Sequence, residues 1–204
     1  LNFLANIVLQ GARAAASVRR ITEIMTAPLD LTDREAACPE KRVERGEIEF
    51  RHVRMRYFKN NREQVLEDIN LHIFPEQFVG IVGSTGSGKS TLVSLICRLY
   101  DADQGQVLVD GTDVRDYSLY HLREGAAVVL QKNTLFSGTI AENLCWGNEE
   151  ASRQEMDWAC RIACADEFIR NFPEGYEREL EQGGSNLSGG QRQRLCIARA
   201  LLKR

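Results

Sequence analysis

The sequence lacks the residue patterns of a zinc site, a disulfide scaffold or a nucleic-acid-binding surface. Its six cysteines form no C-x-x-C pair and have no histidine nearby at zinc-ligand spacing. Four of the cysteines lie in apolar surroundings, so we expect reduced core residues in a cytosolic setting. The formal net charge is -3, and the only Lys/Arg-rich stretches are the short VRRI and CPEKRVER. We therefore expect no nucleic-acid partner.

The first residues also lack the features of a signal peptide or of a complete membrane span. A span needs about 18 apolar residues in a row, and polar residues interrupt this stretch at Asn2, Asn6, Gln10 and Arg13. Residues 1–26 instead carry two seven-residue repeats, which predict a long helix with a narrow seam. The repeats are Leu4, Gly11, Val18 and Met25, and Ile7, Ala14 and Ile21. A packing or coiled-coil helix and the cytosolic foot of a transmembrane helix both fit.

The remaining sequence has the composition of a globular domain. With 204 residues, 43% hydrophobic and 27% charged, the chain is long enough for one domain and an appended segment, and it is neither disordered nor collagen-like. Residues 27–46 contain Pro28, Pro39, Gly46 and many charges without periodicity, which predicts a surface linker. The domain is expected to start just after Gly46.

Alternating residues predict the first strands of this domain. In GEIEFRHVRMRY the alternation forms two strand-like runs with a possible slip between them. A turn is expected at residues 59–63, followed by the strand-like VLEDINLHIF. The short apolar stretch QFVGIVG, residues 77–83, is typical of a buried strand.

The most informative stretch is GSTGSGKST, which matches G-x-x-x-x-G-K-[ST] between an apolar run and the helical pattern TLVSLICRLY. Glycines let backbone N–H groups converge on phosphate oxygens, and the following helix directs its positive end at them. The stretch therefore predicts a phosphate-binding loop rather than an ordinary glycine-rich turn. Lys89 would contact the β- and γ-phosphates, and Ser90 would offer its hydroxyl to Mg²⁺. The candidate binding residues are Gly83, Ser84, Thr85, Gly86, Ser87, Gly88, Lys89, Ser90 and Thr91.

A second motif, LSGGQ at residues 187–191, separates the possible classes of phosphate-loop protein. Ser188, Gly189 and Gly190 would open a helix whose exposed amides and dipole favour an anion. A capped surface helix would explain the serine but not two glycines, which weaken helices. With the phosphate loop upstream, the sequence resembles the nucleotide-binding domain of ABC proteins, whose signature is LSGGQ.

This resemblance covers nearly the whole chain and implies further site residues. Tyr57 looks like the family's adenine-stacking aromatic, although it also fits an ordinary strand tyrosine. Gln131, after the apolar run AAVVL, matches the glutamine that contacts Mg²⁺ and the attacking water and senses the transmembrane part; an ordinary polar residue after a strand is the alternative. The stretch NTLFSGTIAENL is similar to the exporter branch, and residues 151–172 look like the helical subdomain that carries LSGGQ.

The resemblance also implies how a nucleotide would be held. ATP with Mg²⁺ would lie between two subunits, with Lys89 and Gln131 as catalytic residues and Ser90 and Gln131 at the metal. One subunit would supply Tyr57 and the phosphate loop. The other would supply the signature residues Ser188, Gly189, Gly190 and Gln191.

The sequence departs from the family pattern in two places. Leu130 and Lys132 flank Gln131 where many relatives carry Pro and an acidic residue, and residues 181–184 read Glu-Gln-Gly-Gly where many exporters have Gly-Glu-x-Gly. The second change puts in doubt the contact of this loop with membrane-domain helices. Neither change touches the nucleotide chemistry.

The two ends predict that the sequence is part of a longer protein. It begins with Leu1 rather than Met, and it ends in the helical pattern after LSGGQ. Beyond that helix the family has a strand ending in Asp, then a Glu that polarises water, then a switch histidine. None of these is present, and all three histidines, His52, His72 and His121, precede the signature. We therefore expect residues that explain ATP binding better than hydrolysis.

The predicted fold class is α/β: a P-loop NTPase core with an antiparallel β portion and an α-helical subdomain, preceded by a long helix and incomplete at the C-terminus. Residues 1–26 would be the cytosolic end of the last transmembrane-domain helix, 27–46 a linker and 47–204 a partial nucleotide-binding domain, with the helical subdomain at about 132–190. This order resembles an exporter half-transporter at the cytoplasmic face of a membrane, partnered by its own transmembrane domain and a second nucleotide-binding domain. A catalytically degenerate regulatory half of a heterodimeric transporter and a soluble, non-transport ABC ATPase are the alternatives.

Overall fold

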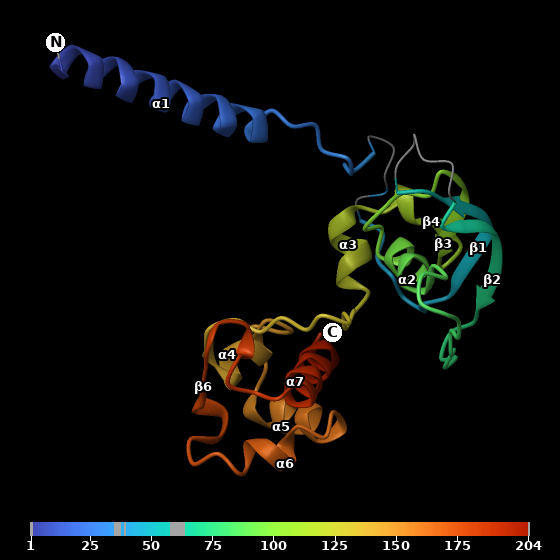
Figure 1. Cartoon of the computed structure of the whole chain (residues 1–204). Coiled ribbons are helices and arrows are strands. Elements are labelled where there is room, and N and C mark those ends of the chain that lie inside the picture. The colour runs from blue at the N-terminus through green and yellow to red at the C-terminus, as the bar shows by residue number, and fades with distance from the viewer. Residues whose placement is uncertain (1, 35–37, 39, 58–63, 204) are drawn as a thin grey trace. The chain divides into compact units, whose positions relative to one another are not determined.

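The computed structural model describes residues 2–34, 38, 40–57 and 64–203 (Figure 1). The chain divides into two compact units, Leu1–Thr32 and Asp33–Arg204. The turn predicted at residues 59–63 lies outside the described residues.

The first unit is dominated by one helix, α1 (Asn2–Met25), which confirms the long helix predicted from the seven-residue repeats. Every α1 side chain that the structure describes is exposed, including Val18, Ile21 and Met25 of the seam. Within the described ranges, no helix combines the length and the apolar character that crossing a membrane requires.

The second unit begins with an antiparallel sheet of four strands in the order β2-β1-β3-β4. Its strands are β1 (Ile48–Met55), β2 (Leu66–Ile73), β3 (Gln104–Val109) and β4 (Thr112–Asp113). The slip predicted within β1 is confirmed, because its pairing with β2 shifts register between Phe50 and Val53. His52 there has a left-handed φ of 50°, and the shift lets Phe50, Val53 and Met55 all face the core.

Helices pack on this sheet to close its hydrophobic core. They are α2 (Lys89–Ile96), the 3₁₀ turn η1 (Val114–Asp116) and α3 (Leu119–Glu124). Leu95 of α2 and Leu122 of α3 are buried with Phe50 and Val107 of the sheet, and the buried Tyr117 donates its hydroxyl hydrogen to the carbonyl of Val109 at 2.9 Å. We refer to residues 47–125 as the β lobe.

A second hydrophobic cluster lies in residues 135–202, which we refer to as the helical lobe. Its elements are β5 (Gly138–Thr139), α4 (Ile140–Cys145), α5 (Arg153–Ile162), α6 (Asp166–Ile169), η2 (Gly175–Glu177), β6 (Glu179–Leu180), η3 (Gln182–Gly184) and α7 (Gly189–Leu202). Strands β5 and β6 pair antiparallel, and α4 and α5 contact α7. Capping boxes begin α4, α5 and α7, which explains why these helices start where they do.

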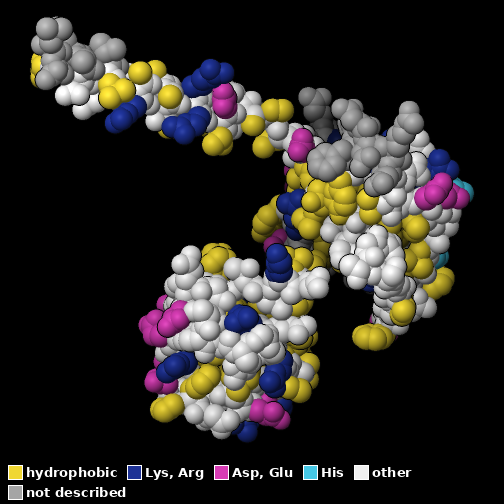
Figure 2. Space-filling view, viewed as in Figure 1, with side chains coloured by type: hydrophobic (Ala, Val, Ile, Leu, Met, Phe, Trp, Pro, Cys, Tyr) yellow, Lys and Arg dark blue, Asp and Glu magenta, His cyan; other side chains and the backbone are white. Residues whose placement is uncertain are grey.

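The prediction of a buried strand over residues 77–83 is wrong for this structure. The segment has no strand pairing, and Phe78 and Val82 are almost fully exposed. The apolar run at residues 126–130 is likewise unpaired, and residues 127–130 are exposed. A strand exists only where a neighbouring strand takes up its backbone hydrogen bonds, and no described strand lies beside either segment. Hydrophobic side chains accordingly appear at the surface of the β lobe (Figure 2).

Candidate nucleotide-binding site

The glycine-rich stretch forms a loop that leads directly into α2. Gly86 and Gly88 have left-handed φ angles of 86° and 84°, which glycine adopts without strain. A Cβ on Gly88 would lie 2.8 Å from the carbonyl oxygen of Val65 and 2.7 Å from a methyl group of Leu66. Packing against the start of β2 thus excludes any larger residue at Gly88, where α2 begins.

The cationic side chain of this loop bonds to the loop itself. The Lys89 ammonium donates to the carbonyl oxygens of Gly83 at 2.8 Å and Ser84 at 2.6 Å, and reaches the Ser87 hydroxyl at 3.3 Å. Gly88, the N-cap of α2, provides no side-chain cap for the first turn of the helix. An ammonium group, a hydroxyl and uncapped helical N–H groups therefore meet at one point, and this donor set fits a phosphate group.

Both residues that the resemblance adds to the loop lie beside it. Tyr57, two residues after β1, and Gln131 line one cavity of about 440 Å³ together with Val65 and the loop residues Thr85, Gly86, Ser87, Gly88, Lys89, Ser90 and Thr91. We refer to it as the P-loop cavity. Gly83 and Ser84 are not among its lining residues, but their carbonyls accept the hydrogen bonds of Lys89.

The signature residues occupy a different place, at the start of α7 in the helical lobe. Ser188 is the N-cap, and its hydroxyl accepts from the backbone N–H of Gln191 at 3.2 Å while its own N–H donates to the Gln191 side chain at 2.9 Å. Ser188, Gly189 and Gly190 are exposed. They are not among the residues that line the P-loop cavity, so this chain does not bring the two predicted parts of the site together.

The exposed glycines of the signature do not serve packing within the chain. A Cβ on Gly190 would meet nothing within 4 Å, and one on Gly189 would come no closer than 3.9 Å to the Arg192 side chain. Arg192 instead fixes the loop before the helix, donating to the carbonyls of Gly184 at 3.1 Å and Leu187 at 2.7 Å. The signature is therefore a fixed, uncovered helix start.

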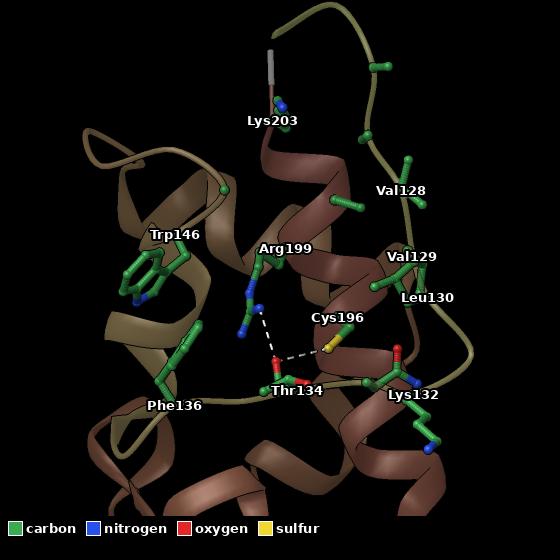
Figure 3. A pocket seen from close by; sticks show the side chains of 15 residues that line it. Val128, Val129, Leu130, Lys132, Thr134, Phe136, Trp146, Cys196, Arg199 and Lys203 are labelled. Atoms are coloured by element: carbon green, nitrogen blue, oxygen red, sulfur yellow. Dashed lines mark hydrogen bonds between the residues drawn. The ribbon is translucent and has the colours of Figure 1, made fainter. Parts of the chain in front are cut away.

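A further cavity, of about 300 Å³, lies between residues 126–134, the end of α4 and α7 (Figure 3). The rings of Phe136 and Trp146 stack at its rim with centroids 4.6 Å apart, and 67% of the Trp146 surface is exposed. Arg199 donates to the carbonyls of Asn143 at 2.8 Å and Thr134 at 3.2 Å, and its burial lowers its pKa. The sequence analysis includes Phe136 only within the stretch NTLFSGTIAENL, and it does not single out Trp146 or Arg199.

Comparison with known proteins identifies the family. Residues 66–204 match the ABC transporter family model, and the chain belongs to this family. It is 44% identical over 191 residues to a putative multidrug export ATP-binding/permease protein of Bacillus subtilis (strain 168), covering 94% of this chain and 33% of that protein. It is 41% identical over 198 residues to an ATP-dependent lipid A-core flippase of Syntrophus aciditrophicus (strain SB), covering 97% of this chain and 32% of the flippase.

A solved structure shows the same fold. The structure of a bacterial Atm1-family ABC exporter with ATP bound matches 95% of this chain and 34% of that chain, with a TM-score of 0.86 and 32% sequence identity. The predicted family and the mixed α/β fold class with an antiparallel sheet are therefore confirmed. The chain spans about a third of the length of the two curated relatives described above.

Proposed function

We propose that the chain is the ATP-binding portion of an ABC exporter, which couples ATP binding and hydrolysis to transport across a membrane. The observation that carries this proposal is the P-loop cavity, where Tyr57, Lys89, Ser90 and Gln131 converge on the uncapped start of α2. The names of the relatives, an export ATP-binding/permease protein and an ATP-dependent flippase, support the transport role.

The residues of the P-loop cavity have separate tasks in this proposal. The Lys89 ammonium exchanges its bonds to the loop carbonyls for bonds to phosphate oxygens, which are stronger acceptors because they are charged. The N–H groups at the start of α2 bind the same oxygens. Ser90 and Gln131 would hold Mg²⁺ through their side-chain oxygens, and the Tyr57 ring would stack on the base. Bound Mg-ATP supplies the phosphoanhydride bond whose hydrolysis drives transport.

A second copy of a nucleotide-binding domain completes the site in this proposal. The start of α7 presents uncovered amides and the positive end of a helix dipole, which favour an anion from outside the chain. The two signature glycines have open space where a side chain would stand, so another molecule can approach the backbone closely. We therefore assign Ser188, Gly189, Gly190 and Gln191 to the nucleotide held by the partner subunit.

The transmembrane part of the same protein is the other proposed partner. The cavity of Figure 3 is lined mostly by apolar residues, with Lys132, Arg199 and Lys203 among them, and two aromatic rings stack at its rim. Such a surface can anchor an inserted segment. It begins at the residues next to Gln131, which links it to the nucleotide site. The exposed seam of α1 is assigned to the end of the last transmembrane helix, placing this chain at the cytoplasmic face of the membrane.

Calorimetric titration with Mg-ATP tests the proposal. Lys89→Ala removes a charge-assisted contact worth about 1.5–3 kcal/mol, so affinity should fall roughly ten- to a hundredfold. Lys132→Ala is the matched control, because Lys132 is exposed and lines the cavity of Figure 3 instead. Equal ATP affinity in wild type and Lys89→Ala, with circular dichroism unchanged, would refute the assignment of this cavity.

A further inference from the structure

The ring of Tyr57 is held by two contacts that come from α2 and the segment after it. Its hydroxyl lies 2.7 Å from the Thr91 hydroxyl, in the first turn of α2. Its ring meets Tyr100 in a T-shaped contact, with centroids 5.0 Å apart and planes at 84°. One contact fixes the tip of the side chain and the other fixes the plane of its ring, a geometry that aromatic pairs favour.

The same segment also holds the backbone that leads to Tyr57. The N–H of Arg56 donates to the Asp103 carboxylate at 2.7 Å, and the N–H of Asp103 donates to the carbonyl of Arg54 at 2.9 Å. Residues 100–103 therefore bind both the ring of Tyr57 and the chain before it. The position of this aromatic is set by the end of the phosphate-loop helix rather than by β1 alone.

Burial in the hydrophobic core does not account for the aromatic pair. Tyr57 is 46% exposed and Tyr100 is 44% exposed, and neither belongs to the buried cluster of the β lobe. A half-exposed tyrosine without such contacts would sample several rotamers, and a ligand would lose affinity by having to order it. Two contacts on an exposed ring indicate that its orientation is useful at the surface.

We propose that Tyr100 is a positioning residue that holds Tyr57, together with Thr91, as a preformed platform for a purine base at the mouth of the P-loop cavity. This inference rests on the proposed ATP-binding function and assigns Tyr100 a part in it. Because Thr91 belongs to the phosphate loop and Tyr100 follows its helix, base and phosphate are bound by one connected unit. Loss of the Tyr100 ring should weaken base binding and leave phosphate binding unchanged.

Calorimetry with two ligands separates these effects: Mg-ATP, and Mg-tripolyphosphate, which has no base. Tyr100→Ala should weaken ATP about 3–10-fold, the scale of one aromatic pair, and leave tripolyphosphate affinity within about twofold. Tyr100→Phe keeps the ring and should restore ATP binding. In a Tyr57→Ala background, Tyr100→Ala should have no further effect on ATP, because the platform is already gone. Tyr120→Ala, an exposed tyrosine elsewhere on the β lobe, is the control.

Three results would overturn the inference. Equal losses of ATP and tripolyphosphate affinity would make Tyr100 a residue of general structure, and unchanged ATP affinity would remove it from base binding altogether. The third result combines two variants: Tyr100→Ala fails to fold, and Tyr57→Phe, which lacks only the hydroxyl contact, binds ATP like wild type. This result would assign Tyr100 to stability alone. If the wild-type chain binds neither ATP nor tripolyphosphate, the proposed ATP-binding function itself fails. This outcome differs from the three results above, which all concern variants of a wild-type chain that binds ATP.

Discussion

At the scale of single residues, glycine serves two purposes in this chain. At Gly88 the surroundings leave no room, since a Cβ would overlap Val65 and Leu66. At Gly190 there is open space, and the backbone there is helical, so the fold itself gives no reason for glycine. The packing of this chain requires Gly88, whereas we assign Gly190 to the contact with the nucleotide held by the partner subunit.

Gly190→Ala separates fold from function at this position. Alanine in place of a helical glycine should stabilise the chain by about 0.5–1 kcal/mol. If the signature binds the partner's nucleotide, the added methyl group should at the same time lower ATP-dependent dimer formation by this chain. Urea denaturation measures the first effect, and analytical ultracentrifugation with and without Mg-ATP measures the second. A stabilised protein that still dimerises like wild type would exclude Gly190 from the interface.

The predicted phosphate loop can be compared with the structure residue by residue. The fixed spacing of the phosphate loop led to its nine residues, and seven of them line one cavity with Tyr57 and Gln131. The partners of Tyr57 were out of reach, because Thr91 is 34 positions away and Tyr100 belongs to no motif. Contacts between distant residues depend on how the elements pack, which spacing alone does not encode.

At the scale of elements, patterns within one segment were reliable and pairing between segments was not. Two consecutive exposed residues, Arg51 and His52, interrupt the alternation of β1 at the point where its pairing shifts register. The β3–β4 hairpin went unnoticed, although Asp110-Gly111 is a strong turn signal and both residues adopt a left-handed φ. Residues 77–83 were misassigned, because an apolar run indicates burial but cannot supply the neighbouring strand.

A buried amide on α4 connects the segment before this helix with α7 in the helical lobe. Asn143 is 2% exposed; its amide nitrogen donates to the carbonyls of Phe136 and Thr139, and its oxygen accepts from the N–H of Phe136 and from Arg199. Asn143→Leu leaves the backbone groups and the Arg199 side chain that bond to this amide without that partner. We expect the free energy of unfolding to fall by about 1–3 kcal/mol for each of these groups that stays buried.

The fluorescence of Trp146 and Trp158, both in the helical lobe, makes urea unfolding of Asn143→Leu measurable. The exposed Asn171 provides the control, since Asn171→Leu should change stability by no more than about 0.5 kcal/mol. If Asn143→Leu unfolds at the same urea concentration as this control, the amide does not hold the lobe together.

At the scale of the whole molecule, the described residues that line the P-loop cavity supply binding groups but no carboxylate base. No Asp or Glu stands among the described residues that line it. General-base catalysis contributes about 10²–10⁴-fold to rate, so we expect the 204-residue chain to bind Mg-ATP weakly and hydrolyse it near the background rate.

A chain extended at its C-terminus by the strand and glutamate that the family carries after the signature helix provides the comparison, with phosphate release measured at matched concentration. It should hydrolyse ATP faster by the factor that a base contributes. The same extension should protect the amides of residues 77–83 and 126–130 from hydrogen exchange, if these exposed runs pair with it. Equal phosphate release from the two chains would mean that a residue before Arg204 activates water.

The two hydrophobic clusters also follow one another along the chain without interleaving. Buried residues of the β lobe run from Phe50 to Leu122, and those of the helical lobe run from Leu135 to Leu202. Domains form during synthesis in the order in which they leave the ribosome, at about 5–20 residues per second. All buried residues of the β lobe are therefore synthesised several seconds before Leu202, and the phosphate loop is synthesised before the signature helix. A nascent chain at that stage already contains Tyr57, the phosphate loop and the apolar run at residues 77–83.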